Sequence, residues 1–207
     1  MKMKSPLLQK VIFIIIFLVL NQTVQAQKKT FDSYLTETNL AYSAPKGYIE
    51  FEVDKYPYVP VKRGYSSILW YLIQNQSEEI LIGFTFIPIR QYLSYKGIDP
   101  NVNLKNTALH EADTTKSKLY YYNSKELKSI NAMQAVKYDL DMDTTLFEKY
   151  DKCKVVIMQR DNIGDGFIYY FYNDKSEGKI DKEIKNTSNM LKFLPDSQFN
   201  PLIYKKD

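Results

Sequence analysis

Two pairs of apolar segments, each pair separated by polar residues, predict β-hairpins. Residues 67–73 and 80–87 are rich in Ile, Leu, Trp, Phe and Tyr and flank a short polar segment. Residues 153–159 and 166–172 have the same character, and the segment between them contains Asn and Gly, which adopt positive backbone dihedrals at low cost. Two hairpins predict an antiparallel sheet. Because both arms of the first hairpin are apolar at successive positions, both faces of that sheet need cover.

Apolar residues recur at helical spacing over residues 103–112 and 179–191, which predicts helices there. Residues 124–130 predict a further short helix between them. Leu104, Ala108, Leu109 and Ala112 would form the buried face of the first helix. Ser124 is expected to be the N-cap of the second helix. In the third helix, we predict a buried stripe that consists of Ile180, Ile184, Thr187 and Leu191. Lys185 is expected to face outward.

The remaining patterns complete one domain. Residues 47–53, 118–122 and 135–141 predict further strands, and residues 27–40 predict a short helix or an arm. No repeat, low-complexity tract or linker interrupts the chain after residue 26. We therefore expect residues 27–207 to form a single α+β domain, with an antiparallel β-sheet built from hairpins and covered by helices.

Residues 1–26 have the pattern of a cleavable signal peptide. Lys2, Lys4 and Lys10 precede or flank the unbroken apolar run Val11–Leu20, and small residues follow before Gln27. As a helix this run would span only about 15 Å, roughly half of a bilayer's hydrocarbon core. We therefore predict a periplasmic or secreted protein with no stable membrane span after signal cleavage.

The charge of the predicted mature chain is close to neutral. The full sequence has 28 Lys and Arg against 24 Asp and Glu. Three of the lysines lie in the leader, which contains no acid, so 25 basic residues face 24 acidic ones in the remainder. A net charge of about +1 gives no electrostatic reason to expect binding to nucleic acid.

Neither the cysteine nor the histidine predicts chemistry. Cys153 is the sole cysteine, so no disulfide can form within the chain, and we expect a small buried side chain at a strand start. His110 is the sole histidine, so every metal centre that needs two histidines is excluded. We expect His110 on a solvated helix face. Because nucleotide-binding and nucleophile-elbow glycine motifs are also missing, we predict no catalytic, cofactor-binding or metal-binding residues.

Three alternating carboxylates, Asp139, Asp141 and Asp143, resemble the opening of a calcium loop. An EF-hand needs Gly at the sixth position of the loop and an acid at the twelfth, where this chain has Thr144 and Tyr150. A solvated polar face is therefore the favoured interpretation, and a weak divalent-cation site is the alternative.

The aromatic runs Tyr120–Tyr122 and Tyr169–Tyr172 suggest two interpretations. Flat aromatic faces stack on sugars, which favours carbohydrate binding. In a strand, however, alternate residues point to opposite faces, so an aromatic core under helices is the simpler interpretation. Asp113–Thr115 and Asp143–Thr145 also resemble the short acceptor motif of protein O-glycosylation in some exported bacterial proteins.

Residues 119–193 resemble a group of exported, mostly uncharacterised bacterial proteins. The resemblance is carried by Ile130–Ala132, Tyr150–Val155, Gly164–Ile168, Tyr170–Tyr172 and Met190–Phe193. In element order, from Pro45–Gly47 to the closing helix, the chain is also similar to the PsbP-like α/β/α sandwich. PsbP-like domains mostly act as accessory or binding modules, and the resemblance implies such a role without supplying catalytic residues.

These observations favour an exported, non-enzymatic binding or accessory module of the bacterial cell envelope. Its expected partner is a protein or a cell-envelope component. The alternative is an envelope hydrolase with paired carboxylates, because such a pair is assembled by the fold and leaves no fixed spacing in the sequence. The alternative needs two acids that face each other in a cleft, about 5–9.5 Å apart.

Overall fold

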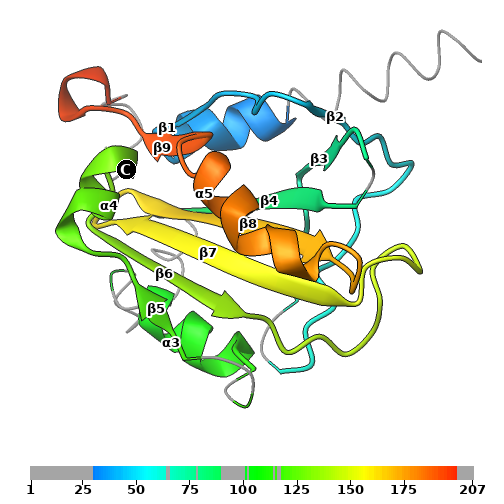
Figure 1. Ribbon diagram of the computed structural model, residues 1–207. Helices are drawn as coiled ribbons and strands as arrows, with labels where there is room; N and C mark the ends of the chain where they lie inside the picture. The colour runs from blue at the N-terminus through cyan, green and yellow to red at the C-terminus, as the bar shows by residue number, and fades with distance from the viewer. Residues whose placement is uncertain are drawn as a thin grey trace, which may run out of the picture.

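A seven-stranded antiparallel sheet forms the centre of the protein (Figure 1). The computed structural model describes residues 30–63, 66–77, 79–89, 101, 103–113, 115 and 118–199. The predicted signal peptide and its cleavage point lie outside the described residues. The strands, in spatial order, are β2 (Tyr48–Glu50), β3 (Tyr71–Asn75), β4 (Leu81–Pro88), β8 (Gly164–Tyr172), β7 (Lys152–Arg160), β6 (Gln134–Asp139) and β5 (Tyr120–Tyr121).

Strand β8 lies in the middle of the sheet and is buried on both faces. All nine of its residues are buried, and it pairs with β4 on one side and with β7 on the other. Ile168, Tyr170 and Tyr172 enter one apolar core, whereas Phe167, Tyr169 and Phe171 enter another. The sheet therefore separates two hydrophobic cores, which confirms the expectation that both faces need cover.

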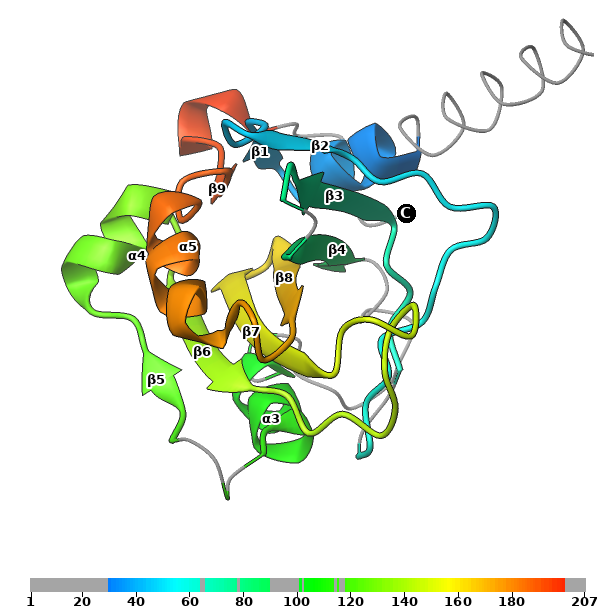
Figure 2. The same ribbon diagram turned by 45° about the vertical axis from the view of Figure 1, so that its right-hand side comes forward.

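One core lies under helices α4 and α5, and we call it the α5-side core. Its cover consists of a helix over residues 30–37, α4 (Ser124–Ile130), α5 (Ile180–Asn186) and a two-stranded ribbon of β1 (Leu40–Tyr42) and β9 (Leu191–Phe193). Phe31 from the first helix is 2% exposed and stacks on Tyr71 of β3, with 4.1 Å between ring centroids. Figure 2 shows α4 and α5 together on one side of the sheet.

The second core, the α3-side core, lies on the opposite face. Helix α3 (Asn103–Glu111) covers β6 and β7 there, and irregular segments within residues 51–63, 66–70 and 140–150 complete the cover. Leu104 and Ala108 are buried, as expected, but Leu109 is 52% exposed. The prediction that Leu109 belongs to the buried face was wrong, because the helix meets the sheet along the narrower stripe of Leu104, Ala108 and Ala112.

Both predicted hairpins are present, and the observed register fixes their limits. Strands β7 and β8 are longer than predicted and pair from Lys152 opposite Tyr172 to Arg160 opposite Gly164. The turn uses Asn162 at φ 61° and Gly164 at φ 145°. A Cβ on Gly164 would lie 2.6 Å from the carbonyl oxygen of Ile87, so this close approach of β4 requires glycine.

The last helix is shorter than the sequence pattern predicted. It follows a 3-10 turn at Glu177–Lys179 and ends at Asn186, and Leu191 belongs to β9 instead. The Thr187 hydroxyl donates to the Glu183 carbonyl at 2.8 Å, and the Ser188 hydroxyl donates to the Lys185 carbonyl at 2.9 Å. Side chains that bond to the backbone in this way compete with helix continuation. Ile184 is nevertheless buried and Lys185 is exposed, so the predicted stripe is confirmed over α5 itself.

Other boundaries also differ from the prediction. Asn123, not Ser124, is the N-cap of α4. Strand β2 covers only three residues of the predicted 47–53, and Ile49 within it is 58% exposed, as suits an edge strand. The pairing of β1 with β9 was not predicted, because two three-residue strands distant in sequence leave no periodic signal.

Candidate functional site

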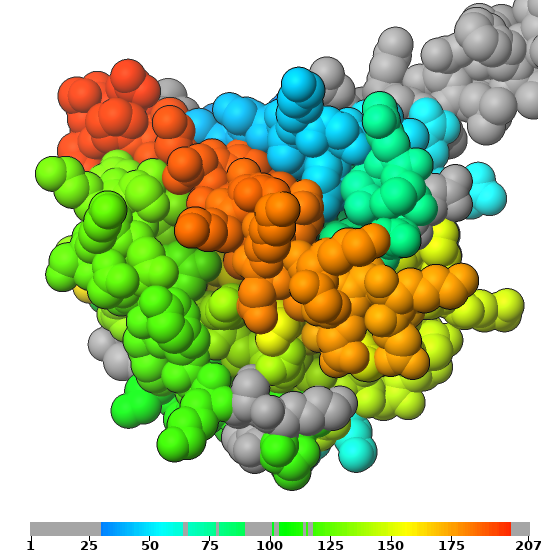
Figure 3. Space-filling model, in the orientation of Figure 1, coloured from blue at the N-terminus to red at the C-terminus, as the bar shows by residue number. Residues whose placement is uncertain are grey.

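A pocket lies between α4 and α5, beside the edge of the sheet at β5 and β6. It has a volume of about 590 Å³, and we call it the inter-helix pocket. In the space-filling view (Figure 3), α4 with β5 and α5 border a hollow at this position. Its lining residues are Tyr120, Tyr122, Lys125, Glu126, Ser129, Ile130, Lys137, Asp181, Ile184, Lys185, Ser188 and Asn189. The pocket is within the usual size range for small-molecule sites, roughly 300–1,000 Å³.

The α4 wall of the pocket is fixed by a capping box. The Asn123 side chain accepts hydrogen bonds from the backbone N–H groups of Lys125 and Glu126, at 2.9 and 3.1 Å. In return, the Glu126 carboxylate accepts the Asn123 N–H at 2.8 Å. This reciprocal arrangement satisfies donors that a helix start leaves unpaired. It therefore holds Glu126 at the first turn of α4 and beside β5.

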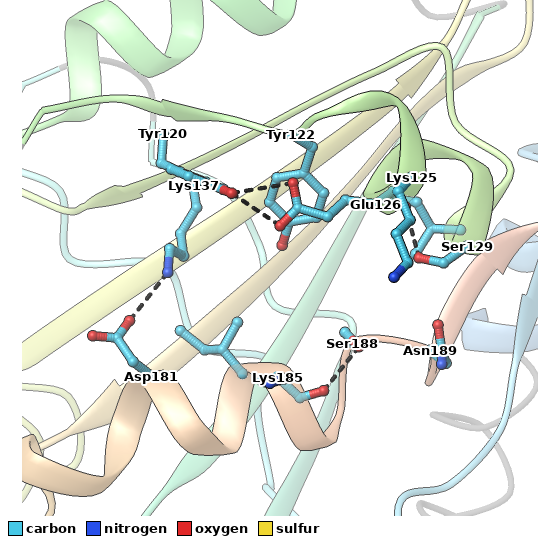
Figure 4. A pocket seen from close by; sticks show the side chains of 12 residues that line it. Tyr120, Tyr122, Lys125, Glu126, Ser129, Lys137, Asp181, Lys185, Ser188 and Asn189 are labelled. Carbon is cyan, nitrogen blue, oxygen red and sulfur yellow. Dashed lines mark hydrogen bonds and ion pairs between the residues drawn. The ribbon is translucent and has the colours of Figure 1, made fainter.

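Glu126 also binds the first tyrosine of the β5 strand. The Tyr120 hydroxyl donates to both carboxylate oxygens, at 3.0 and 3.2 Å, and this hydrogen bond raises the pKa of Tyr120. Tyr120 and Tyr122 lie edge to face, with ring centroids 6.0 Å apart. The tyrosine pair and Glu126 thus form one connected wall (Figure 4).

Lys137 connects the sheet to α5 across the end of the pocket. Its ammonium group lies 3.1 Å from an Asp181 carboxylate oxygen and 5.4 Å from the centroid of the Tyr120 ring. The lysine side chain is 25% exposed and the Asp181 side chain is 67% exposed, so this is a surface ion pair that contributes little to stability. The Lys137–Asp181 pair links α5 to β6 at the end of the pocket.

The floor of the pocket is apolar. Ile130 of α4 and Ile184 of α5 are 1% and 4% exposed and belong to the α5-side core. Tyr122 packs against the same core, and burial, together with the charge of Glu126, raises the pKa of Tyr122 to about 12. The phenol of Tyr122 stays protonated at neutral pH and can donate a hydrogen bond.

Several polar groups at the rim have no partner among the described residues. Among the residues that the structure describes, no carboxylate lies within ion-pair distance of Lys125 on α4 or Lys185 on α5. The side chain of Asn189 has no hydrogen bond in the same set. Figure 4 shows the Lys125 side chain extending from α4 toward the space between the two helices. The pocket thus combines an apolar floor with spare cationic and amide groups at its rim.

The two carboxylates of the pocket already have structural roles. Glu126 completes the α4 capping box and accepts from Tyr120, while Asp181 pairs with Lys137. A glycosidase pair needs one acid free to donate a proton and another free to act as base or nucleophile. This arrangement gives the alternative of a paired-carboxylate hydrolase no support at the inter-helix pocket.

A second pocket, of about 450 Å³, lies near the start of α5 and contains more charged groups. Lys152 pairs with Asp174 at 2.6 Å and with Glu177 at 2.7 Å, and these hydrogen bonds raise the pKa of Lys152. Lys154 pairs with Asp139 at 2.8 Å. Each lysine is neutralised by its own acids, so this pocket presents fewer spare donors than the inter-helix pocket.

The structure separates the three alternating carboxylates. Asp139 pairs with Lys154, whereas Asp141 is 9% exposed and pairs with Arg63 at 3.0 Å. Asp143 is exposed in the loop that follows β6. Within the described part of the chain, no group of three or more His, Cys, Asp or Glu side chains is placed to hold a metal ion.

Glu111 is a buried carboxyl group outside the inter-helix pocket. It is 4% exposed at the end of α3, and its carboxylate accepts the Tyr138 hydroxyl at 2.7 Å. Burial raises the pKa of Glu111 to about 7, and the Tyr138 hydrogen bond opposes that shift only in part. His110, one residue earlier, is exposed, as predicted. Glu111 makes the α3-side core sensitive to pH near neutrality.

The remaining candidates are Cys153, as one group, and the two glycosylation-like triplets, as the other. Cys153 is a free thiol, 2% exposed at the start of β7, as predicted, and burial raises its pKa. Of the two glycosylation-like triplets, residues 143–145 are exposed, whereas Asp113 is 6% exposed and accepts the Thr115 hydroxyl at 2.5 Å. Neither group contributes to the inter-helix pocket.

The sequence prediction missed the pocket itself, although parts of its wall left a signal. Asn123 followed three residues later by Glu126 is a capping-box pattern next to the aromatic run Tyr120–Tyr122. That pattern indicates that a tyrosine of this run lies beside the start of a helix, where the capping-box glutamate can hold it. The approach of Lys185 and Asn189 from α5, however, depends on packing and has no local signature.

Comparison with known proteins gives one structural similarity. No family model matches the chain, and no curated protein matches it. The structure is similar to the solution structure of cyanobacterial PsbP (CyanoP) from Synechocystis, at 12% sequence identity and a TM-score of 0.33. The match covers 77% of this chain and 89% of that one. The helices and the antiparallel sheet make the chain an α+β protein. Its resemblance to this PsbP-like protein is weak, and membership of that family stays a prediction.

No helix within the described ranges is both long enough and apolar enough to cross a membrane.

Proposed function

We propose that the protein is an exported, non-enzymatic binding module and that the inter-helix pocket holds its ligand, a component of the cell envelope. The observation that carries the proposal is the composition of the pocket: its floor is apolar, and Lys125, Lys185 and Asn189 at its rim have no partner among the described residues. Ligand sites in proteins typically combine an apolar lining with a few polar groups that fix orientation.

The state of the carboxylates supports binding rather than hydrolysis. Glu126 and Asp181 are held by Asn123, Tyr120 and Lys137, so each contributes to the walls of the pocket. Rigid walls favour binding, because a site that is already ordered loses less conformational entropy when the ligand arrives. The capping box on the α4 wall supplies this rigidity.

A pair of tryptophan substitutions tests whether the pocket is the binding site. Ser129→Trp places a large side chain at the rim of the pocket, from an exposed position on α4. Ser33→Trp makes the same change at an exposed position of the helix over residues 30–37, away from the pocket lining. We expect Ser129→Trp to abolish co-sedimentation of the mature protein with envelopes of the producing organism, and Ser33→Trp to leave it unchanged. Unchanged co-sedimentation of both variants would overturn the proposal.

Export is tested separately by mass spectrometry of the protein from its producing cells. The signal pattern predicts a mature N-terminus at Gln27, in part as pyroglutamate. A soluble protein that retains Met1 would contradict export and with it the envelope as the source of the ligand.

A further inference from the structure

We infer that the ligand of the inter-helix pocket is an acidic saccharide, whose carboxylate lies between Lys125 and Lys185 while one face of its sugar ring rests against Tyr120 and Tyr122. This inference rests on the function proposed above and names the chemistry of the ligand. It follows from the balance of charge in the pocket, from the position of the spare donors and from the shape of the polar and apolar surfaces.

The charge balance of the lining favours an anion. Five charged side chains line the pocket, three lysines and two acids. Lys137 and Asp181 neutralise each other at 3.1 Å. Glu126 is held on the α4 side by the capping box and Tyr120. Those hydrogen bonds come from neutral groups, so Glu126 keeps its negative charge. Lys125 and Lys185 have no ion-pair partner among the described residues, and with three lysines against two acids the lining carries one net positive charge.

The two spare lysines approach from different walls. Lys125 extends from α4, and Lys185 belongs to the last turn of α5. Asn189, in the segment that follows α5, adds an amide whose N–H₂ group can donate. A carboxylate between these groups can accept from both ammonium groups and from the amide. Such charge-assisted hydrogen bonds are stronger than those between neutral groups.

The floor and the tyrosine wall favour a sugar ring as the carrier of that anion. The partly buried Tyr122 and the exposed Tyr120 present aromatic surface above Ile130 and Ile184, which are 1% and 4% exposed. The Tyr122 hydroxyl has no hydrogen bond among the described residues. A pyranose ring has an apolar C–H face and polar hydroxyl groups around its edge, so it matches an aromatic wall with a polar rim. Tyr120, 46% exposed beside the floor, adds aromatic surface next to the ring.

Trigalacturonic acid and its methyl ester are matched probes for this inference. The ester keeps the sugar rings and removes the carboxylate charge. We expect the mature protein to bind the acid at least about tenfold more tightly than the ester, since two ion pairs are lost together. The preference should shrink as salt is added, because both lysines are exposed. Isothermal titration calorimetry measures both affinities, and inorganic phosphate serves as a competitor without a sugar ring.

Lysine substitutions on the same two helices provide the controls. Lys125→Gln and Lys185→Gln should each weaken binding of the acid about three- to fivefold, the range for one exposed ion pair, and leave binding of the ester unchanged. Lys128→Gln on α4 and Lys182→Gln on α5 remove the same charge from exposed positions outside the pocket lining and should leave both affinities unchanged.

The outcomes separate this inference from the proposed function. Equal affinity for the acid and the ester, equal effects of all four lysine variants, competition by phosphate at the same concentration as the acid, or no binding of either probe would each overturn the acidic saccharide. In those cases a loss of envelope binding in Ser129→Trp would still support the inter-helix pocket as the site. If Ser129→Trp binds the envelope normally, the proposed function fails first.

Discussion

Two tyrosine-rich segments of similar composition differ in how far their side chains are exposed to solvent. In strand β8, Tyr169, Tyr170 and Phe171 are at most 1% exposed and divide between two cores. In strand β5, Tyr120 and Tyr121 are 46% and 50% exposed. The residues are alike, but β8 is the central strand of seven and β5 is an edge strand.

The difference teaches that position in the sheet, and not side-chain type, decides whether an aromatic run supplies stability or surface. A central strand has neighbours on both sides and layers on both faces, so its rings are enclosed. An edge strand lacks a neighbour on one side. In β5 this leaves Tyr120 to contact Glu126 and Lys137 and to line the inter-helix pocket.

Truncation in the central strand should have the largest effect on stability. Phe171→Ala removes a ring that is 0% exposed and stacks on Tyr169, with ring centroids 6.1 Å apart. We expect the free energy of unfolding to fall by about 3–5 kcal/mol, the usual cost of a large cavity in a core. Urea denaturation measures the effect. A loss below about 1 kcal/mol would show that the centre of the sheet is not the main source of stability.

Ile184 lies at the boundary between core and pocket, so its truncation tests both regions. Ile184→Ala should lower the free energy of unfolding by about 2–5 kcal/mol, because the side chain is 4% exposed under α5. Lys185→Ala, on the exposed side of the same turn, should stay within about 0.5 kcal/mol. Equal changes in the two urea midpoints would show that the buried face of α5 has been misassigned.

The α3-side core should respond to pH through Glu111. Since burial raises the pKa of this carboxyl group from 4.5 to about 7, the folded state retains a proton that the unfolded state releases. The contribution of Glu111 to the free energy of unfolding should therefore be greatest below about pH 4.5. It should fall by on the order of 3 kcal/mol as the pH rises to about 7.

Glu111→Gln removes that titration while keeping an acceptor for the Tyr138 hydroxyl. Relative to the wild type, the variant should gain stability between about pH 5 and pH 8 in urea denaturation, since only the wild type loses stability over this range. Glu52→Gln, an exposed carboxyl group, serves as the control and should show little gain. If the free energies of unfolding of the wild type and of Glu111→Gln depend on pH in the same way, the raised pKa of Glu111 is contradicted.

The smallest effects are expected in β5 and at the start of α4. Asn123→Ala removes the N-cap of α4 and should cost about 1 kcal/mol. Tyr121→Ala, at an exposed edge position, should change the free energy of unfolding by less than about 0.5 kcal/mol. Thermal or urea denaturation of both variants would show whether the edge strand contributes as little to stability as its exposure indicates. A loss of several kcal/mol in Tyr121→Ala would remove the contrast with β8.

Much of the fold could be predicted from the sequence, because local patterns specify it. The two hairpins follow from apolar segments that flank short polar ones, and the buried position of Ile184 follows from the helical spacing of apolar residues. The short helix α4 was predicted from its N-cap region, one residue from the observed cap. The end of α5 could not be predicted in this way, since the apolar spacing continues to Leu191. The competing hydrogen bonds of Thr187 and Ser188, together with the pairing of β9 with β1, end the helix.

The candidate site was harder to predict from the sequence than the fold. The capping box that holds Glu126 is local, but its partner wall on α5 lies more than fifty residues away in the chain. Lys125 and Lys185 resemble any other exposed lysines in the sequence. Only the packing of α4 and α5 on the same core places the two residues at one pocket.

The most direct test of the account is to map the binding surface at residue level. Titration of the isotopically labelled mature protein with trigalacturonic acid would be followed by backbone amide chemical shifts. We expect the largest shifts at β5, at α4 and in residues 185–189, with little change in β8 and α3. Shifts centred on α3, or no shifts at concentrations where the acid binds, would contradict the claim that the inter-helix pocket is the ligand site.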